Sequence, residues 1–85
     1  MTRSVRIVFF AAAREAAGTS SVDREVPARG ATLATLLAGL VQERPRLGPI
    51  LQGSRFARNG EYVRGPRARV APGDEIAVHP PYSGG

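Results

Sequence analysis

The chain has 85 residues and no cysteine, which allows one small domain and excludes disulfides, iron–sulfur clusters, cysteine nucleophiles and thiolate zinc sites. Apolar residues make up 42% of the chain and charged residues 22%, the composition of a globular domain and not of a disordered tail. The net charge of +5 comes from twelve arginines and no lysine, and because these arginines are scattered, we expect no nucleic-acid partner.

The first predicted elements are two strands joined by a turn. Val5, Ile7 and Phe9 alternate with other residues over residues 4–10, a pattern typical of a strand with one apolar face. We interpret residues 11–21 as a turn because they end in glycine, threonine and serines. A second strand then carries Val22 and Val26, and the short separation predicts a hairpin.

The N-terminus superficially resembles a secretion signal, because basic residues precede an apolar run. That run covers only residues 7–13, and cleavage there would remove the best strand. We therefore expect a cytoplasmic protein. No stretch approaches the roughly 20 apolar residues needed to span a bilayer, so we expect no membrane partner.

The clearest helix begins after Thr32, a suitable N-cap. It ends near Arg44, because the residue before a proline is disfavoured in the helical conformation. Its apolar stripe follows the spacing i, i+3, i+4, i+7 and i+8: Leu33, Leu36, Leu37, Leu40 and Val41. Gly39 inside the helix is tolerable if a neighbouring element packs closely there. Residues 45–54, rich in proline and glycine, are interpreted as a connection.

The remaining elements are strands separated by turns. Asn59-Gly60 within residues 55–63 is a strong signal for a type I′ hairpin turn. Ala71-Pro72-Gly73-Asp74 has the residues of a type II turn. Residues 75–79 form the last predicted strand, with Ile76 and Val78 on one face. We therefore predict an α+β domain over residues 1–81, with one main helix on one face of a mixed sheet.

The last six residues carry the chemistry that we predict. Pro80 and Pro81 follow the last strand directly and favour an extended exit from the sheet. Residues 82–85 then form a flexible tail, Tyr82-Ser83-Gly84-Gly85. The two glycines have no Cβ and can thread a narrow channel, and a terminal glycine presents an unhindered carboxylate. That carboxylate needs a partner to activate it.

Several motifs resemble the MoaD/ThiS family of ubiquitin-like sulfur carriers, and within it the small subunits of molybdopterin synthase. The resemblance covers essentially the whole chain. It rests on the opening strand and turn, the helix, the later hairpin and the closing motif: Phe9-Phe10-Ala11 with Arg14-Glu15 and Gly18-Thr19, residues 32–40, Asn59-Gly60 with Val63, and Gly73-Asp74-Glu75-Ile76-Ala77 with Pro80-Pro81 and Gly84-Gly85.

The resemblance implies a β-grasp fold and a carrier without catalytic residues of its own. An enzyme related to the one that activates ubiquitin would adenylate Gly85, using ATP and magnesium. A sulfur donor protein would then leave a covalent sulfur on Gly85 as a thiocarboxylate. The large synthase subunit, expected in a heterotetramer, would receive the tail and pass the sulfur to precursor Z. The chain itself would bind no cofactor, and with one histidine and seven acids we expect no metal site.

The resemblance also places an apolar partner interface at Phe10, Tyr62 and His79. On the first and last strands, Phe10 and His79 alternate with the residues predicted to be buried. His79 stands where the family usually has a large apolar residue, and weaker or pH-sensitive docking follows as a hypothesis. The arginines of the later strands could steer an acidic partner or serve solubility: Arg55, Arg58, Arg64, Arg67 and Arg69. Arg14 and Glu15 could equally be a solvated surface pair.

Three other functions remain open on the sequence. The same carrier chemistry could serve thiamine, cysteine or secondary-metabolite synthesis, although Pro80-Pro81 favours the molybdopterin branch. A protein modifier would share the activation of Gly85 but join its tail to substrate lysines. The third alternative is a small arginine-rich nucleic-acid-binding module, whose binding to DNA or RNA would not depend on Gly84 and Gly85.

Overall fold

The computed structural model describes residues 3–81, which form seven strands and three helices. In chain order the elements are β1 (Ser4–Phe9), α1 (Ala11–Ala17), β2 (Ser21–Glu25), β3 (Ala31–Thr32), α2 (Leu33–Glu43), α3 (Leu47–Gln52), β4 (Arg55–Arg58), β5 (Glu61–Tyr62), β6 (Arg69–Val70) and β7 (Glu75–His79). Of the predicted domain, residues 1–81, the structure describes all but the first two residues. The predicted tail, residues 82–85, lies outside the described residues.

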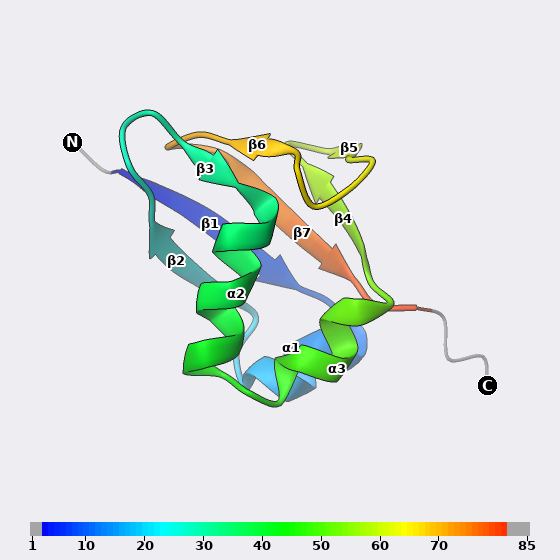
Figure 1. The fold of residues 1–85 in the computed structure, drawn as a ribbon. Coiled ribbons are helices and arrows are strands. Elements are labelled where there is room, and N and C mark those ends of the chain that lie inside the picture. The colour runs from blue at the N-terminus through cyan, green and yellow to red at the C-terminus, as the bar shows by residue number, and fades with distance from the viewer. Residues whose placement is uncertain (1–2, 82–85) are drawn as a thin grey trace.

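A five-stranded mixed sheet organises the molecule, in the order β2-β1-β7-β4-β5. The central strand β7 is parallel to its neighbour β1, and the other pairs are antiparallel. The strands β3 and β6 form a separate two-stranded ribbon. Helix α2 lies across one face of the five-stranded sheet, while α1 and α3 lie together near the end toward which β1 and β7 point (Figure 1). This is the β-grasp arrangement that the sequence motifs imply.

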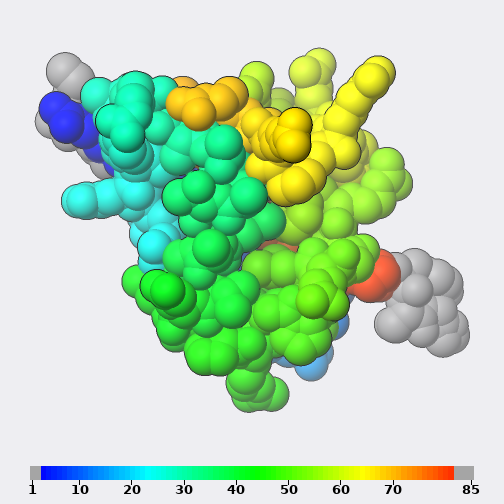
Figure 2. Space-filling model, in the orientation of Figure 1, coloured from blue at the N-terminus to red at the C-terminus, as the bar shows by residue number. Residues whose placement is uncertain are grey.

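The core lies between the sheet and α2. Val5, Ile7 and Phe9 of β1 are fully buried, as their alternation predicts, and Ile76 and Val78 of β7 lie beside them. Leu33, Leu36 and Leu40 of α2 cover these strands, and Figure 2 shows the helical side chains spread over this face. Burying each such side chain contributes about 1.5–3 kcal/mol before the cost of ordering the chain.

Helix α2 begins and ends where the sequence predicts. The Thr32 hydroxyl accepts a hydrogen bond from the Thr35 backbone N–H at 3.2 Å, and the helix ends at Glu43, with Arg44 as its C-cap before Pro45. The prediction for Gly39 is also confirmed, since the guanidinium of Arg24 occupies the space that a Cβ there would need. A side chain at Gly39 would require the guanidinium of Arg24, which also pairs with Glu43 on α2, to shift.

The prediction of a turn over residues 11–21 is wrong for its first seven residues, which form α1. Alanine has the highest helix propensity of all residues, and this segment reads AAAREAA. Gly18 ends the helix in the left-handed conformation (φ +78°), and its N–H donates to the Arg14 carbonyl. Because Ala13 and Ala17 are buried, tertiary packing adds to the local preference. β1 and β2 pair as predicted, but a helix and not a tight turn joins them.

The prediction of a structureless connection over residues 45–54 is also incomplete, because α3 lies within it. Pro49 sits in the first turn of α3, where a missing backbone N–H costs nothing. Leu47 and Leu51, four residues apart, are both buried. The described residues therefore contain two short helices besides α2, which is the predicted main helix on one face of the sheet. None of the three helices is long and apolar enough to cross a membrane.

The two predicted turns are confirmed, and polar side chains join them. Asn59 and Gly60 have φ values of +50° and +89° in the β4–β5 turn, and Gly73 has a φ of +92°. The Asn59 amide nitrogen donates to the Asp74 carboxylate at 3.0 Å, and the Asn59 carbonyl accepts from the Glu75 N–H at 2.9 Å. The other carboxylate oxygen of Asp74 accepts from the Ala71 N–H at 2.8 Å. Asp74 therefore ties the hairpin to the start of β7.

Candidate functional site

Three aromatic side chains meet on the face of the sheet opposite α2, and we call them the aromatic patch: Phe10, Tyr62 and His79. The rings of Phe10 and His79 are stacked, with centroids 4.9 Å apart and planes 4° apart. The Tyr62 ring meets His79 edge-on at 5.8 Å. Phe10 is 44% and Tyr62 55% exposed, and no other large apolar side chain in residues 3–81 is as exposed. The patch therefore presents apolar surface to solvent.

Strand register brings these residues together from distant parts of the sequence. Phe9 pairs with Val78 across the parallel strands β1 and β7, which places Phe10 beside His79. Ala57 of β4 pairs with Ala77 on one side and with Tyr62 on the other. Since directly paired residues share a face, Tyr62 lies on the same face as His79. The predicted grouping of Phe10, Tyr62 and His79 is thus present, while their role in binding a partner stays a prediction.

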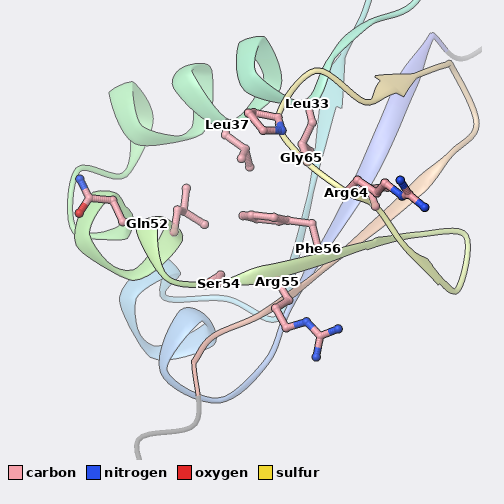
Figure 3. Close-up of a pocket in the computed structure, with 11 residues that line it drawn as sticks. Leu33, Leu37, Gln52, Ser54, Arg55, Phe56, Arg64 and Gly65 are labelled. Carbon is pink, nitrogen blue, oxygen red and sulfur yellow. The ribbon is translucent and has the colours of Figure 1, made fainter.

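Arg55 is a fourth member of this surface, and the sequence prediction assigned it only to a general basic face. It pairs directly with His79 across β4 and β7. Its guanidinium carbon lies 4.2 Å from the centroid of the Tyr62 ring, within the range of a cation–π contact. Figure 3 shows the Arg55 side chain on the side of β4 opposite to Phe56, which points toward α2. Only the β4–β7 register, which the sequence does not reveal, could have identified it.

The root of the predicted tail adjoins the patch. His79 is the last residue of β7, and Pro80 and Pro81 follow it directly. Pro81 lies against Gly53, the residue after α3, because a Cβ built on Gly53 would be 3.2 Å from Cγ of Pro81. Gly53 thus leaves room for the chain to exit here. The predicted tail residues Tyr82, Ser83, Gly84 and Gly85 lie outside the described residues.

The remaining arginines of the later strands divide into two groups. Arg58 donates to the Arg69 carbonyl at 2.7 Å, and Arg69 donates to the Arg29 carbonyl at 3.0 Å. These two side chains therefore hold loops together. Arg64 and Arg67 are exposed. In the part of the chain that the structure describes, no three side chains of His, Asp or Glu are placed to hold a metal ion.

A pocket of about 450 Å³ lies on the helical side of the sheet. It opens between α2, the end of α3 and the start of β4, and the ring of Phe56 points into it while the guanidinium of Arg64 points away (Figure 3). The apolar side chains around it are Leu33, Leu37, Leu51, Phe56, Val63 and Pro66. Leu37, Phe56 and Val63 are only partly buried, which shows how thin the core of so small a domain is.

Known proteins resemble this chain over nearly its whole length. A model of the ThiS family matches residues 7–85. The chain is 39% identical over 83 residues to the molybdopterin synthase sulfur carrier subunit of Chlamydomonas reinhardtii, with 95% of this chain and 98% of that protein covered. It is 33% identical over 86 residues to the protein of the same name from Dictyostelium discoideum, with all of both chains covered.

A solved structure also has the same fold as this chain. The crystal structure of SAMP1 from Haloferax volcanii superposes with a TM-score of 0.83 at 32% sequence identity. The match covers 96% of this chain and 99% of that protein. The ubiquitin-like fold that the sequence motifs imply is therefore confirmed by the architecture and by this likeness.

Proposed function

This chain belongs to the ThiS family, and we propose that it is the sulfur carrier subunit of a molybdopterin synthase, with the sulfur held on Gly85. The observation that carries this proposal is the identity of 39% and 33% to two proteins named as such subunits, over nearly the whole of each chain. The structure supports it by placing the exit of the chain beside the aromatic patch. A partner that docks on the patch would thus lie close to the root of the tail.

The proposed reaction has two steps, and both are catalysed by partners. An activating enzyme, with ATP and magnesium, joins the Gly85 carboxylate to the α-phosphate of ATP, and pyrophosphate leaves. Sulfide delivered by a sulfur donor protein then attacks the acyl-adenylate, and AMP leaves with the electron pair of the broken bond. The product is a thiocarboxylate in which sulfur has replaced one carboxylate oxygen of Gly85. Because activation consumes ATP, we expect the carrier to work in the cytoplasm.

The chain's own residues position the carboxylate and do not activate it. The sequence has no cysteine, and its one histidine, His79, stacks on the ring of Phe10. The aromatic patch supplies apolar area for docking, and Pro80 and Pro81 direct the chain away from the sheet. In the large synthase subunit, expected in a heterotetramer with this chain, the thiocarboxylate would give its sulfur to precursor Z and water would restore the carboxylate.

Intact mass measurement tests the proposal. The full chain is incubated with an activating enzyme of the family, ATP, magnesium and sulfide, beside a variant that lacks Gly85. We expect a mass gain equal to the replacement of one oxygen by sulfur in the full chain and none in the variant. An unchanged mass, with an enzyme that loads a known carrier in parallel, would contradict the proposal.

The likeness to SAMP1, a protein described as a small archaeal modifier, favours one second candidate. A protein modifier would use the same activated Gly85 but form an amide with a lysine of another protein. This chain has no lysine, so it could not form chains through its own side chains. After activation in a cell lysate, covalent adducts on other proteins would indicate modification, and a free thiocarboxylate alone would indicate sulfur delivery.

A further inference from the structure

Arg55 gives the aromatic patch a positive charge that its rings do not supply. Its guanidinium lies over the Tyr62 ring at 4.2 Å, and its backbone pairs with that of His79. Contact with an aromatic face holds an arginine in place while the edge of its planar group, with five N–H donors, stays available. The side chain is exposed, and so those donors face the surface on which a partner would dock.

No carboxylate of the described chain neutralises this charge. The ion pairs within residues 3–81 join Arg6 to Asp23 and Arg24 to Glu43, and neither involves Arg55. Glu61 is next to Tyr62 in β5, and because neighbouring side chains of a strand point to opposite faces, it faces away from the patch. Glu75 begins β7 and is four residues from His79, about 13 Å along the strand. That distance exceeds the Debye length of about 8 Å at physiological salt.

We infer that Arg55 is a specificity-determining residue of the docking surface, and that the protein partner presents a carboxylate to it beside apolar side chains that cover the aromatic patch. This inference rests on the proposed function, because it describes the partner of the same surface. A purely apolar partner would bury the guanidinium without a counter-charge, which is costly. A partner with a basic side chain there would be repelled. Arg55 therefore favours a partner with a carboxylate at this point and disfavours a purely apolar partner or one with a basic side chain there.

The test compares three variants of the full chain in binding to the large synthase subunit of the same organism, measured by isothermal titration calorimetry. Arg55→Met keeps an unbranched apolar stem over Tyr62 and removes the charge. Arg55→Glu reverses the charge. Arg67→Met is the matched control, because it changes the net charge equally at another exposed position. Circular dichroism confirms that each variant is folded, and titrations run at about 50 and 300 mM salt, on either side of physiological screening.

We expect Arg55→Met to weaken binding about tenfold and Arg55→Glu to weaken it further, while Arg67→Met stays within about twofold. Raising the salt concentration should narrow the difference between Arg55→Met and the unmodified chain. Equal effects of Arg55→Met and Arg67→Met, or tighter binding by Arg55→Glu, would overturn the role of Arg55 and leave the proposed function standing. Failure of the unmodified chain to bind would overturn both, and the mass measurement would then show whether Gly85 is nevertheless loaded.

Discussion

The rings of Phe10 and His79 stack face to face, with centroids 4.9 Å and planes 4° apart, although 68 residues lie between them in the sequence. The parallel pairing of β1 with β7 creates this contact, since Phe9 pairs with Val78 and the two following residues continue side by side. Phe10 is also the N-cap of α1, so its backbone is fixed by the helix that starts there. The stack therefore couples the end of β7, from which the tail departs, to a rigid part of the domain.

The first prediction concerns the apolar area of the aromatic patch. The side chains that face His79 are Phe10, Tyr62 and Arg55, and Phe10 and Tyr62 are exposed. His79→Phe keeps the stacking on Phe10 and replaces the polar imidazole by a wholly apolar ring. Because covering apolar surface favours association, we expect titration calorimetry to show tighter binding of the large synthase subunit by His79→Phe than by the unmodified chain.

Phe10→Ala is the control for that experiment, because it removes ring area and leaves the imidazole. Its affinity should be lower than that of the unmodified chain. Weaker binding by His79→Phe than by the unmodified chain would contradict the prediction, as would an unchanged affinity in Phe10→Ala.

The second prediction concerns the stability of the closing motif. Asp74 accepts hydrogen bonds from the Asn59 side chain at 3.0 Å and from the Ala71 N–H at 2.8 Å. Asp74→Ala removes both acceptors, and we expect the free energy of unfolding to fall by about 1–2 kcal/mol, measured by urea denaturation. Because Asp74 lies at the start of β7 and the aromatic patch at its end, affinity for the large subunit should change little. A large loss of affinity with unchanged stability would show that Asp74 contacts the partner instead.

Local patterns in the sequence are sufficient to predict the strand and the helix that form most of the core. The alternation of Val5, Ile7 and Phe9 and the stripe of leucines after Thr32 predict β1 and α2, because burial on one face imposes a period on the sequence. α1 and α3 were missed for a different reason. Each is short, and residues typical of turns or of helix breaks, such as Gly18 and Pro49, lie within or beside it. Their burial against the rest of the domain is a tertiary effect that no local pattern contains.

The residues of the candidate site also fall into two groups: those that a local pattern in the sequence places, and those that only the assembled fold places. Alternation alone places Phe10 and His79 on the outer face of the sheet. Each directly follows a buried residue, Phe9 or Val78, and neighbouring side chains of a strand point to opposite faces. Arg55 could not be placed beside Tyr62 and His79, because that requires knowing which strands pair and in which register. The contact between Gly53 and Pro81 joins the end of α3 to the residues after β7, and it too depends on the assembled fold.

The third prediction concerns Gly53, which we expect to set the direction in which the tail leaves the domain. Its φ of −103° is open to any residue, so the reason for a glycine is space, because a Cβ would be 3.2 Å from Cγ of Pro81. Gly53→Val adds branched bulk at this point and must push Pro81 aside. Since a displacement of about 1 Å can slow a positioned reaction by up to about a hundredfold, we expect the initial rate of thiocarboxylate formation to fall about tenfold. Mass spectrometry of timed samples measures this rate.

Gly65→Val is the matched control for Gly53→Val, because no atom lies within 4 Å of a Cβ built on Gly65. The control should load at the rate of the unmodified chain, and urea denaturation should show that both variants keep their free energy of unfolding within about 1 kcal/mol. If Gly53→Val loads as fast as Gly65→Val, the activating enzyme accepts the tail from more than one exit direction. The contact between Gly53 and Pro81 would then serve only to pack the end of α3. A slow rate in Gly53→Val with unchanged stability would instead show that the activating enzyme requires the exit direction that this glycine permits.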